Sequence, residues 1–302
     1  MEYKHRITVF TPTYNRAYII EKLYNSLKRQ NYVDFEWLVV DDGSSDNTED
    51  IFKIWSNENN PFTIRYYKTE NGGKHRAINM GLDLADGEIF FTVDSDDELT
   101  NDALFKINQW FEQIADNDEI QGIVANRGYS ESGTINNYFL EDYMDAYLID
   151  MHKIVENGKK VLDGERAIAF YTDFHKKYKF PEFDGEKFMT EAVVYNRMSH
   201  DNYKMRFFND IIWIYEYQSD GLTKAGTKLF INNPKGYGLW IKEKNKFEKN
   251  SLLRTFITKY QFVCDLMNYW SCQVIAEAFQ MSRIEVRLLE SFHVVRTWLK
   301  GH

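Results

Sequence analysis

The sequence predicts an α/β fold, in which a mixed, mostly parallel sheet is flanked by helices and followed by a helical C-terminal extension. Two observations carry this prediction. The first half of the chain alternates short β-like runs with helix-like segments, which is the pattern of a parallel sheet with crossover helices. Beyond about residue 232 the pattern becomes helix-rich and shows no internal repeat.

The expected elements follow from where apolar runs and turn residues fall. Strands are expected at Ile7–Phe10, Trp37–Val40, Ile64–Tyr67, Ile89–Val93 and Gly122–Ala125. Helices between them are expected at Ala17–Gln30, Asn47–Ser56, Lys74–Ala85 and Asn101–Ala115. Later in the chain we expect a turn or hairpin at Arg127–Asn137, a hairpin of Tyr203–Phe208 and Ile211–Tyr217 that turns at Asn209-Asp210, and three helices within Lys235–Leu299.

The composition is that of a globular protein. Of the 302 residues, 43% are hydrophobic and only 4 are proline, which excludes a mainly disordered chain. The net charge of −9 argues against nucleic-acid binding. The first residues do not resemble a secretion signal, and no run approaches the roughly 20 apolar residues of a membrane span. We therefore expect a cytoplasmic protein, either soluble or peripheral at the inner face of the membrane.

The two cysteines are expected to be structural. Cys264 and Cys272 should lie in one helical segment, roughly 12 Å apart along its axis, which is too far for a disulfide bond between them. Both should be reduced packing residues, as is usual in a cytoplasmic protein.

Polar loops follow the expected strands and should converge on one edge of the sheet. Thr11–Arg16 combines hydroxyls, an aromatic ring and a cation, which suits either a nucleoside or a simple helix cap. Asp41–Asp46 places two carboxylates at a strand exit, where helix capping explains only the last residues. Asn71–Arg76 joins two glycines to basic residues at a helix start, which favours a phosphate site over a plain tight turn.

The most acidic loop is Asp94–Asp97, which follows an apolar strand pattern. Like charges this close repel one another, so a divalent cation or a ring of hydrogen-bond donors should compensate them. Carboxylate ligands favour Mg²⁺ or Mn²⁺. Zinc is disfavoured, because the sequence has no Cys/His cluster with zinc-ligand spacing.

Together these segments resemble those of the family 2 glycosyltransferases, the nucleotide-sugar-dependent enzymes of the GT-A fold. The resemblance is strong over about residues 5–126 and weaker to about residue 225. Its carriers are Ile7–Arg16, Trp37–Asp46, Asn71–Asn79, and Ala85–Glu88 leading to Asp94–Asp97. It implies a GT-A-type, Rossmann-like sheet in which Asp94 and Asp96 occupy the outer positions of the family's DxD motif.

The resemblance also implies roles for individual residues. Asp42 would read a uracil-type base, and Lys74 would lie in the basic region near the nucleotide. Asp96 would coordinate the metal, Mn²⁺ or Mg²⁺, with Asp94 and Asp97 as further candidate ligands. The nucleotide-sugar-binding residues that it implies are Thr11, Pro12, Tyr14, Arg16, Asp42, Lys74, Asp94 and Ser95.

A base that removes the acceptor proton is expected in the acidic loop Phe180–Glu191. In the family, a Glu-Asp pair precedes a helix that carries an Arg six residues after the Asp. Glu191 takes the Asp position, with Arg197 six residues on, while Thr190 replaces the Glu. Glu186 is the alternative base, and Asp184 and Glu182 are further ones; Glu191 could instead only supply an anion to the first turn of the helix.

The sequence thus predicts an inverting, metal-dependent glycosyltransferase of the hexosyltransferase class, which uses a nucleotide-diphosphate donor, a UDP-sugar. The acceptor would be a glycan or lipid-linked glycan in cell-surface polysaccharide biosynthesis. The alternatives are a sugar-1-phosphate nucleotidyltransferase and a non-catalytic nucleotide-sugar-binding protein of the same fold. Residues 1–126 would form the nucleotide-binding half, 127–232 the acceptor-binding and catalytic half of the same domain, and 233–302 the helical C-terminal region.

Two later segments leave alternatives open. A stripe of apolar residues recurs at near-helical spacing close to the C-terminus, among basic residues: Ile284, Leu288, Phe292, Val295 and Trp298. This stripe could pack against the main domain, form a homodimer or adsorb to an anionic membrane. Tyr215–Thr223 could form a mobile flap over the donor or an ordinary surface turn.

Overall fold

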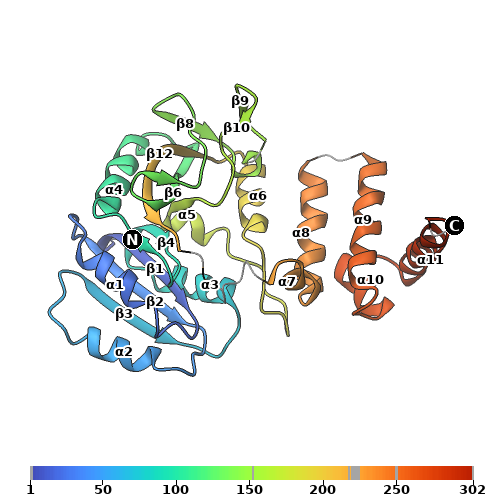
Figure 1. Ribbon diagram of the computed structural model, residues 1–302, viewed down its shortest axis with the longest axis horizontal. Helices are drawn as coiled ribbons and strands as arrows, with labels where there is room; N and C mark the ends of the chain where they lie inside the picture. Colours follow the sequence, from blue (N-terminus) through green and yellow to red (C-terminus); the bar gives the residue numbers. More distant parts are fainter. Residues whose placement is uncertain (1–2, 152, 217, 219–224, 249–250, 301–302) are drawn as a thin grey trace. The chain divides into compact units, whose positions relative to one another are not determined.

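The computed structural model describes the chain except for residues 1–2, 152, 217, 219–224, 249–250 and 301–302 (Figure 1). The chain divides into two compact units. The first comprises Met1–Lys179 and Arg197–Ser219, and the second comprises Phe180–Asn196 and Asp220–His302.

The first unit is built on one sheet, in the order β3-β2-β1-β4-β11-β6-β12-β5, with β7 beside β6 and β8 beside β12. Strands β1 to β4 are parallel to their neighbours within this group, β11 is antiparallel to β4 and β6, and β12 is parallel to β6. The strands of the sheet are β1 (His5–Thr13), β2 (Phe35–Asp41), β3 (Thr63–Lys68), β4 (Gly87–Thr92), β5 (Glu98–Leu99), β6 (Ile120–Ser130), β7 (Gly133–Thr134), β8 (Tyr143–Ala146), β11 (Ala167–Tyr171) and β12 (Lys204–Ile214). The predicted mixed, mostly parallel sheet is confirmed. Strands β9 (Val155–Glu156) and β10 (Lys159–Lys160) form a separate antiparallel pair.

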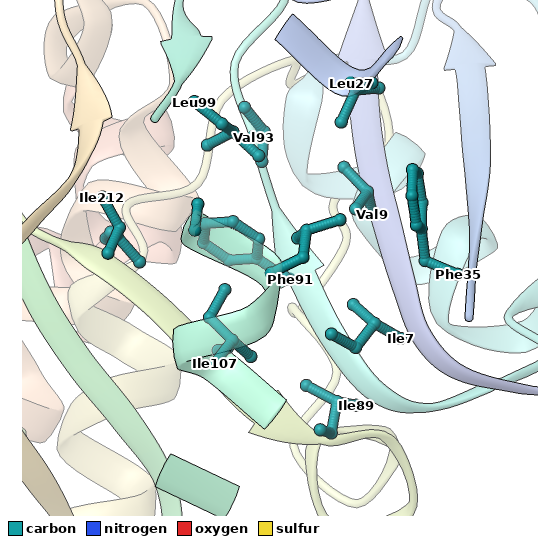
Figure 2. Packing of buried hydrophobic residues seen from close by; sticks show 14 of the residues in the cluster. Ile7, Val9, Leu27, Phe35, Ile89, Phe91, Val93, Leu99, Ile107 and Ile212 are labelled. Carbon is teal, nitrogen blue, oxygen red and sulfur yellow. The ribbon is translucent and has the colours of Figure 1, made fainter. Parts of the chain in front are cut away.

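Helices cover both faces of this sheet. They are α1 (Glu21–Lys28), α2 (Thr48–Trp55), α3 (Lys74–Leu84), α4 (Ala103–Ile114), the short 3₁₀ helix η1 (Leu148–Asp150) and α5 (Thr172–Lys176). Val9 and Phe91 of the sheet join Leu27 of α1 and Ile107 of α4 in one buried cluster (Figure 2). On the opposite face the ring of Phe10 packs against Gly81 of α3. It lies so close that a Cβ at this position would clash with the ring.

Each strand and helix predicted for the first half is present, and the differences lie at the ends. The first strand continues to Thr13, so Thr11 and Pro12 lie in β1 rather than in the loop after it. The fifth predicted strand continues to Ser130 and forms the expected hairpin with β7. Residue 126, where the sequence places a division, therefore lies inside β6.

The hairpin predicted at residues 203–217 is wrong, because β12 is one strand. Asn209 lies in a register shift between Phe207 and Ile211 in the pairing with β6. The Asn209 amide donates to the Phe139 carbonyl oxygen at 2.9 Å. The Asn-Asp pair is therefore a bulge that anchors a preceding loop rather than a turn. Residues 219–224 of the expected flap, including Gly221 and Thr223, lie outside the described residues.

The second unit confirms a helical C-terminal region. Its helices are α7 (Thr227–Ile231), α8 (Pro234–Phe247), α9 (Leu252–Leu266), α10 (Cys272–Phe279) and α11 (Arg283–Lys300). Helix α6 (Ala192–His200) begins in this unit and ends in the first. Phe262, Ile275 and Val286 are fully buried and form the centre of its core. Among the described residues, no helix is long and apolar enough to cross a membrane.

Two details of the C-terminal prediction are wrong. The segment after Lys235 holds four helices rather than three. Cys264 lies on α9 and Cys272 on α10, so they do not share one helix. The break follows from a helix cap, since the Ser271 side chain accepts a hydrogen bond from the backbone N–H of Val274 and starts α10. Both cysteines are free thiols.

Candidate functional site

The polar loops of the first half gather at the carboxyl edge of the parallel strands. Thr13 at the end of β1 pairs with Asp41 at the end of β2. Thr92 at the end of β4 pairs with Phe10 of β1, so Asp94 follows at the same edge. This edge is where open α/β sheets bind their ligands.

The end of β1 combines buried and exposed residues. Thr11 and Pro12 are buried, and the Trp37 indole N–H donates to the Thr11 hydroxyl at 3.0 Å, which holds that hydroxyl inside the sheet. Tyr14 is 48% exposed, so its ring is accessible to a planar ligand. Asn15 has a φ of 53° and accepts a hydrogen bond from Ser45 N at 2.8 Å, which joins the loops after β1 and β2.

Asp41 and Asp46 support the loop after β2. One oxygen of Asp41 accepts from Ser44 N at 2.7 Å, and the other accepts from the Tyr66 hydroxyl. Burial acts to raise the pKa of Asp46, but hydrogen bonds from Thr48 and from neighbouring backbone groups outweigh burial and lower that pKa. Asp46 accepts from Thr48 N at 3.1 Å, so it caps α2 as expected.

Asp42 holds the turn that precedes α3. Its Oδ1 accepts from Gly72 N at 2.6 Å, and its Oδ2 accepts from Gly73 N at 2.8 Å and from the Asn71 amide at 3.1 Å. Gly73 has a φ of 97°, a conformation that favours glycine. Asp42 therefore fixes the start of α3, where Lys74 is the first helical residue.

Asp94 lies between two cations. Its Oδ1 is 2.8 Å from Lys74 Nζ, and its Oδ2 is 3.8 Å from an Nη atom of Arg127. Burial acts to raise the pKa of Asp94, but the charges of Lys74 and Arg127 outweigh it and lower that pKa. The charge of Arg16 also lowers it, which places this third predicted residue within electrostatic range. Asp94 is thus an ionised carboxylate.

Asp97 is held by β12 and by the second residue after that strand. Its carboxylate accepts from the Trp213 indole N–H at 2.7 Å and from Glu216 N at 3.2 Å. Burial and the nearby charge of Asp94 raise the pKa of Asp97 to about 7. The guanidinium of Arg127 lies over the Trp213 ring, 3.7 Å from its centroid, and closes the cluster.

Asp96 differs from both neighbouring aspartates. It is half-buried, and in the part of the chain that the structure describes its carboxylate forms no ion pair with a basic side chain. Burial and the charge of Asp94 raise the pKa of Asp96. Among the described residues, no three His, Cys, Asp or Glu side chains could hold a metal ion by themselves. The oxygens of Asp96 and Asp94 fit Mg²⁺ or Mn²⁺ if a bound phosphate supplies further ligands, as is common for Mg²⁺.

Arg127 and Trp213 were not singled out from the sequence. Both lie inside longer strands than the sequence predicts, Arg127 in β6 and Trp213 in β12, which are parallel neighbours. Arg127 is only 9% exposed. A basic residue that directly continues an apolar strand pattern was the available signal, since a charge inside a strand calls for a partner.

The candidate bases belong to the second unit. Glu191 immediately precedes α6, and its carbonyl oxygen accepts from Val194 N at 3.0 Å, as in a helix first turn. The buried carboxylate of Glu186 accepts from Lys235 N at 2.7 Å and from Gly236 N at 2.9 Å. Glu186 is therefore committed to the amino end of α8, where an anion is stabilising. This structural role favours Glu191 as the base.

The fold and the site define an α/β protein with a ligand site at the carboxyl edge of its sheet. A family model described as "Glycosyl transferase family 2" matches residues 8–154. The chain is 35% identical over 106 residues to the GalNAc(5)-diNAcBac-PP-undecaprenol beta-1,3-glucosyltransferase of Campylobacter jejuni, covering 34% of this chain and 34% of that protein. It is 29% identical over 228 residues to glycosyltransferase GlyG of Streptococcus pneumoniae, covering 72% and 73%. The alignments with the first curated relatives span about a third of those proteins.

Solved structures share the fold at low identity. TarS of S. aureus in complex with UDP-GlcNAc aligns with a TM-score of 0.57 and 17% identity, covering 98% of this chain and 92% of that one. The mannosyltransferase PcManGT of Pyrobaculum calidifontis, in complex with GDP-Man and Mn²⁺, aligns with a TM-score of 0.54 and 17% identity, covering 98% and 83%. Residues 8–154 thus form a family 2 glycosyltransferase domain, and the chain has the GT-A fold.

Proposed function

We propose that this glycosyltransferase moves a sugar from a UDP-sugar to a hydroxyl group of a glycan or lipid-linked glycan, with inversion at the anomeric carbon. The observation that carries the proposal is the charge arrangement at the sheet edge. Asp94 is ionised between Lys74 and Arg127, and Asp96 beside it has no ion-pair partner among the described residues. Such a cluster suits a nucleoside diphosphate ligand that binds together with a divalent cation.

The loops at the sheet edge would bind the donor. Tyr14 would stack on the base, and Asp42 would accept the ring N–H of uracil. Lys74, at the amino end of α3, would face the diphosphate. The other residues proposed to line the donor site are Thr11, Pro12, Arg16, Asp94 and Ser95.

Asp96 is the proposed metal ligand. When bound, Mn²⁺ or Mg²⁺ would neutralise the charge that develops on the leaving diphosphate. Asp94, which already faces Lys74, would be a second ligand, whereas Asp97 is engaged by Trp213 and suits this role less well. The complex of PcManGT, a protein of the same fold, with GDP-Man and Mn²⁺ supports the use of a divalent cation.

Glu191 is the proposed base. Its carboxylate would take the proton of the acceptor hydroxyl while that oxygen bonds to the anomeric carbon. The bond from this carbon to the diphosphate would break, and the nucleoside diphosphate would leave with the electron pair. Attack from the side opposite the leaving group would invert the anomeric configuration.

The names of relatives support an acceptor in cell-surface glycan synthesis. The Campylobacter relative is named for an undecaprenol-linked glycan. A Staphylococcus aureus relative, 37% identical over 101 residues, is named as a poly(ribitol-phosphate) beta-N-acetylglucosaminyltransferase. We therefore propose a role in polysaccharide biosynthesis on the cytoplasmic side of the membrane, where a lipid-linked acceptor would be met.

A donor screen tests this proposal. The full chain would be heated with UDP-, GDP- and dTDP-sugars, each with and without Mn²⁺, and its melting temperature recorded. A UDP-sugar with Mn²⁺ should raise the melting temperature most, because a ligand that binds only the folded state stabilises it. Release of UDP in the presence of a glycan acceptor should follow. When pyrophosphate is added, its consumption with formation of a nucleoside triphosphate and a sugar 1-phosphate would instead indicate a nucleotidyltransferase, and binding without turnover of any donor would contradict the proposal.

Replacing the proposed base tests the acceptor side separately. Glu191→Gln should keep the donor-induced thermal shift but lower the turnover about 100-fold or more. Glu131→Gln, at an exposed position outside this loop, is the control and should keep wild-type turnover. Wild-type turnover of the Glu191→Gln variant would reject Glu191 as the base.

A further inference from the structure

Helices α9 and α11 expose a set of large apolar side chains, here called the apolar face. Both helices belong to the second unit and contact each other near the C-terminus of the described chain (Figure 1). Ile284 is 73% exposed and Leu288 is 65% exposed. The face comprises Leu253, Ile257, Ile284, Leu288, Phe292 and Trp298.

Helix α11 is apolar on two opposite sides. Val286 and Leu289 are buried in the core of the second unit. Ile284, Leu288 and Phe292 follow one another at four-residue spacing, which places them together on a different side of the helix. The core of the second unit therefore does not use this side.

The apolar face continues from α11 onto α9. The ring of Phe292 lies 6.3 Å from that of Phe256, which is itself exposed, and 5.4 Å from that of Tyr260. Leu253 and Ile257 are four positions apart, so they lie together on the same side of α9. A continuous face over two helices is larger than the single exposed apolar residues that are normal on protein surfaces.

The exposed charges on these two helices are basic. Among the described side chains of α9 and α11, the exposed charged residues are Arg254, Arg283, Arg287 and Arg296. The acidic residues are half-buried, and two of them are engaged inside the unit. Glu285 accepts from Lys259 at 2.6 Å, and Asp265 accepts from the Tyr237 hydroxyl at 2.8 Å.

This local excess of positive charge contrasts with the chain as a whole, whose net charge is −9. Arg283 and Arg287 lie at one side of the Ile284–Leu288 stripe by helical spacing, and Arg296 lies at the other. An apolar stripe with arginines along its sides is the arrangement of a helix that lies in the plane of an anionic bilayer surface. The apolar side chains enter the acyl boundary, and the arginines meet lipid phosphates.

We propose that the apolar face of α9 and α11 docks the enzyme on the surface of an anionic lipid bilayer. A second copy of the chain would fit the apolar residues, but a two-fold pairing would bring the same exposed arginines together and would be opposed by their repulsion. Trp298, 61% exposed near the end of α11, suits the headgroup level, where aromatic side chains are enriched. This docking is independent of which sugar is transferred.

Vesicle binding of the full chain tests the proposal without donor or acceptor. Vesicles of phosphatidylcholine with about a third phosphatidylglycerol would be sedimented with the protein and compared with pure phosphatidylcholine vesicles. Binding should need the anionic lipid and weaken with salt. Arg283→Gln/Arg287→Gln should lower the partition coefficient about 20-fold, and Ile284→Gln/Leu288→Gln about tenfold or more.

Matched variants on the first unit test whether vesicle binding is specific to the apolar face. Val33→Gln/Ile54→Gln changes two residues that are 59% and 63% exposed, and Lys159→Gln/Lys160→Gln removes two exposed charges. Both should bind vesicles as the wild type does. Equal binding to neutral and anionic vesicles, or no binding to either, would overturn the proposal. So would a dimer in light scattering that Ile284→Gln/Leu288→Gln dissociates, because the face would then be an interface between copies.

Loss of sugar transfer in the donor screen with vesicle binding intact would reject the proposed function and leave the docking standing. The converse result, transfer to a soluble acceptor without vesicle binding, would reject only the docking.

Discussion

The two acidic loops at the sheet edge differ in how the chain compensates the negative charge of their aspartates. After β2, Asp42 is surrounded by hydrogen-bond donors of the chain, which come from Gly72, Gly73 and Asn71. After β4, Asp94 has two nearby cations, but Asp96 has no ion-pair partner among the described residues, and its pKa is raised. Hydrogen bonds within the chain thus compensate the charge of Asp42, whereas no ion pair among the described residues compensates the charge of Asp96.

This difference separates structural from ligand-dependent charge. A buried carboxylate with backbone donors stabilises the fold, because both partners are satisfied. A half-buried carboxylate beside a like charge lowers stability unless something else compensates it. The first loop should therefore matter to the unfolding free energy, and the second should matter to activity. The four predictions below test this contrast in turn.

The largest effect is expected at Asp96. Asp96→Asn should lower the rate of sugar transfer roughly 100-fold, equivalent to about 2.7 kcal/mol in the barrier, because the variant would lose a ligand of the cation that neutralises the leaving diphosphate. Its unfolding free energy should stay the same or rise, since the like-charge repulsion with Asp94 is removed. Initial rates at saturating Mn²⁺ and chemical denaturation would measure the two quantities. A loss of activity below about threefold would reject the metal-ligand role.

At Asp42 the stability effect should dominate. Asp42→Ala leaves the N–H groups of Gly72 and Gly73 without their acceptor, which should lower the unfolding free energy by about 2 kcal/mol. Asp118→Ala, at an exposed position, is the control and should change it by less than about 0.5 kcal/mol. Urea denaturation without nucleotide compares the three proteins. A stable Asp42→Ala variant would show that the turn before α3 does not depend on this carboxylate.

The raised pKa of Asp97 predicts that the unfolding free energy depends on pH. Its pKa is about 7 in the folded protein, above the ordinary value of 3.8, so the unfolded chain loses this proton at lower pH than the folded one. Stability from this group is therefore highest at low pH, falls as pH rises from about 4 to 7 and is constant above that range. In EDTA, the wild type should lose stability relative to Asp97→Asn over this range, by up to about 1.4 kcal/mol per pH unit. A constant difference between the two proteins would contradict the raised pKa.

The sequence was sufficient for the parts of the site that are local. Apolar runs followed by Asp and Ser marked the ends of β2 and β4, because strand and loop are adjacent in the chain. The sequence did not reveal that Asp42 holds the turn before α3, since its partners lie about 30 residues away and the contact depends on the pairing of β2 with β3.

The contact between Arg127 and Trp213 was likewise not predictable from local sequence, and it joins residues that are farther apart in the chain. They meet because β6 and β12 are parallel neighbours, although 86 positions separate the two residues. The local turn rule at Asn209-Asp210 failed for the same reason, because pairing with β6 and β8 outweighed it. Glu186 likewise acquired its role from α8, through contacts 49 and 50 positions away. Contacts of this kind follow from topology rather than from any local pattern.

The smallest effect on stability is expected at Lys74. This position tests most directly whether a charge of the acidic cluster serves the fold or the ligand. Its ion pair with Asp94 is half-exposed, so Lys74→Gln should lower the unfolding free energy by only about 0.5 kcal/mol. If Lys74 also binds the diphosphate, the same change should raise the KM for the donor about tenfold. Lys68→Gln, which removes an ion pair of similar length at the end of β3, is the control and should leave the KM unchanged. A donor KM that does not change in Lys74→Gln would mean that Lys74 only neutralises Asp94, and that the diphosphate is bound by other cations of the edge.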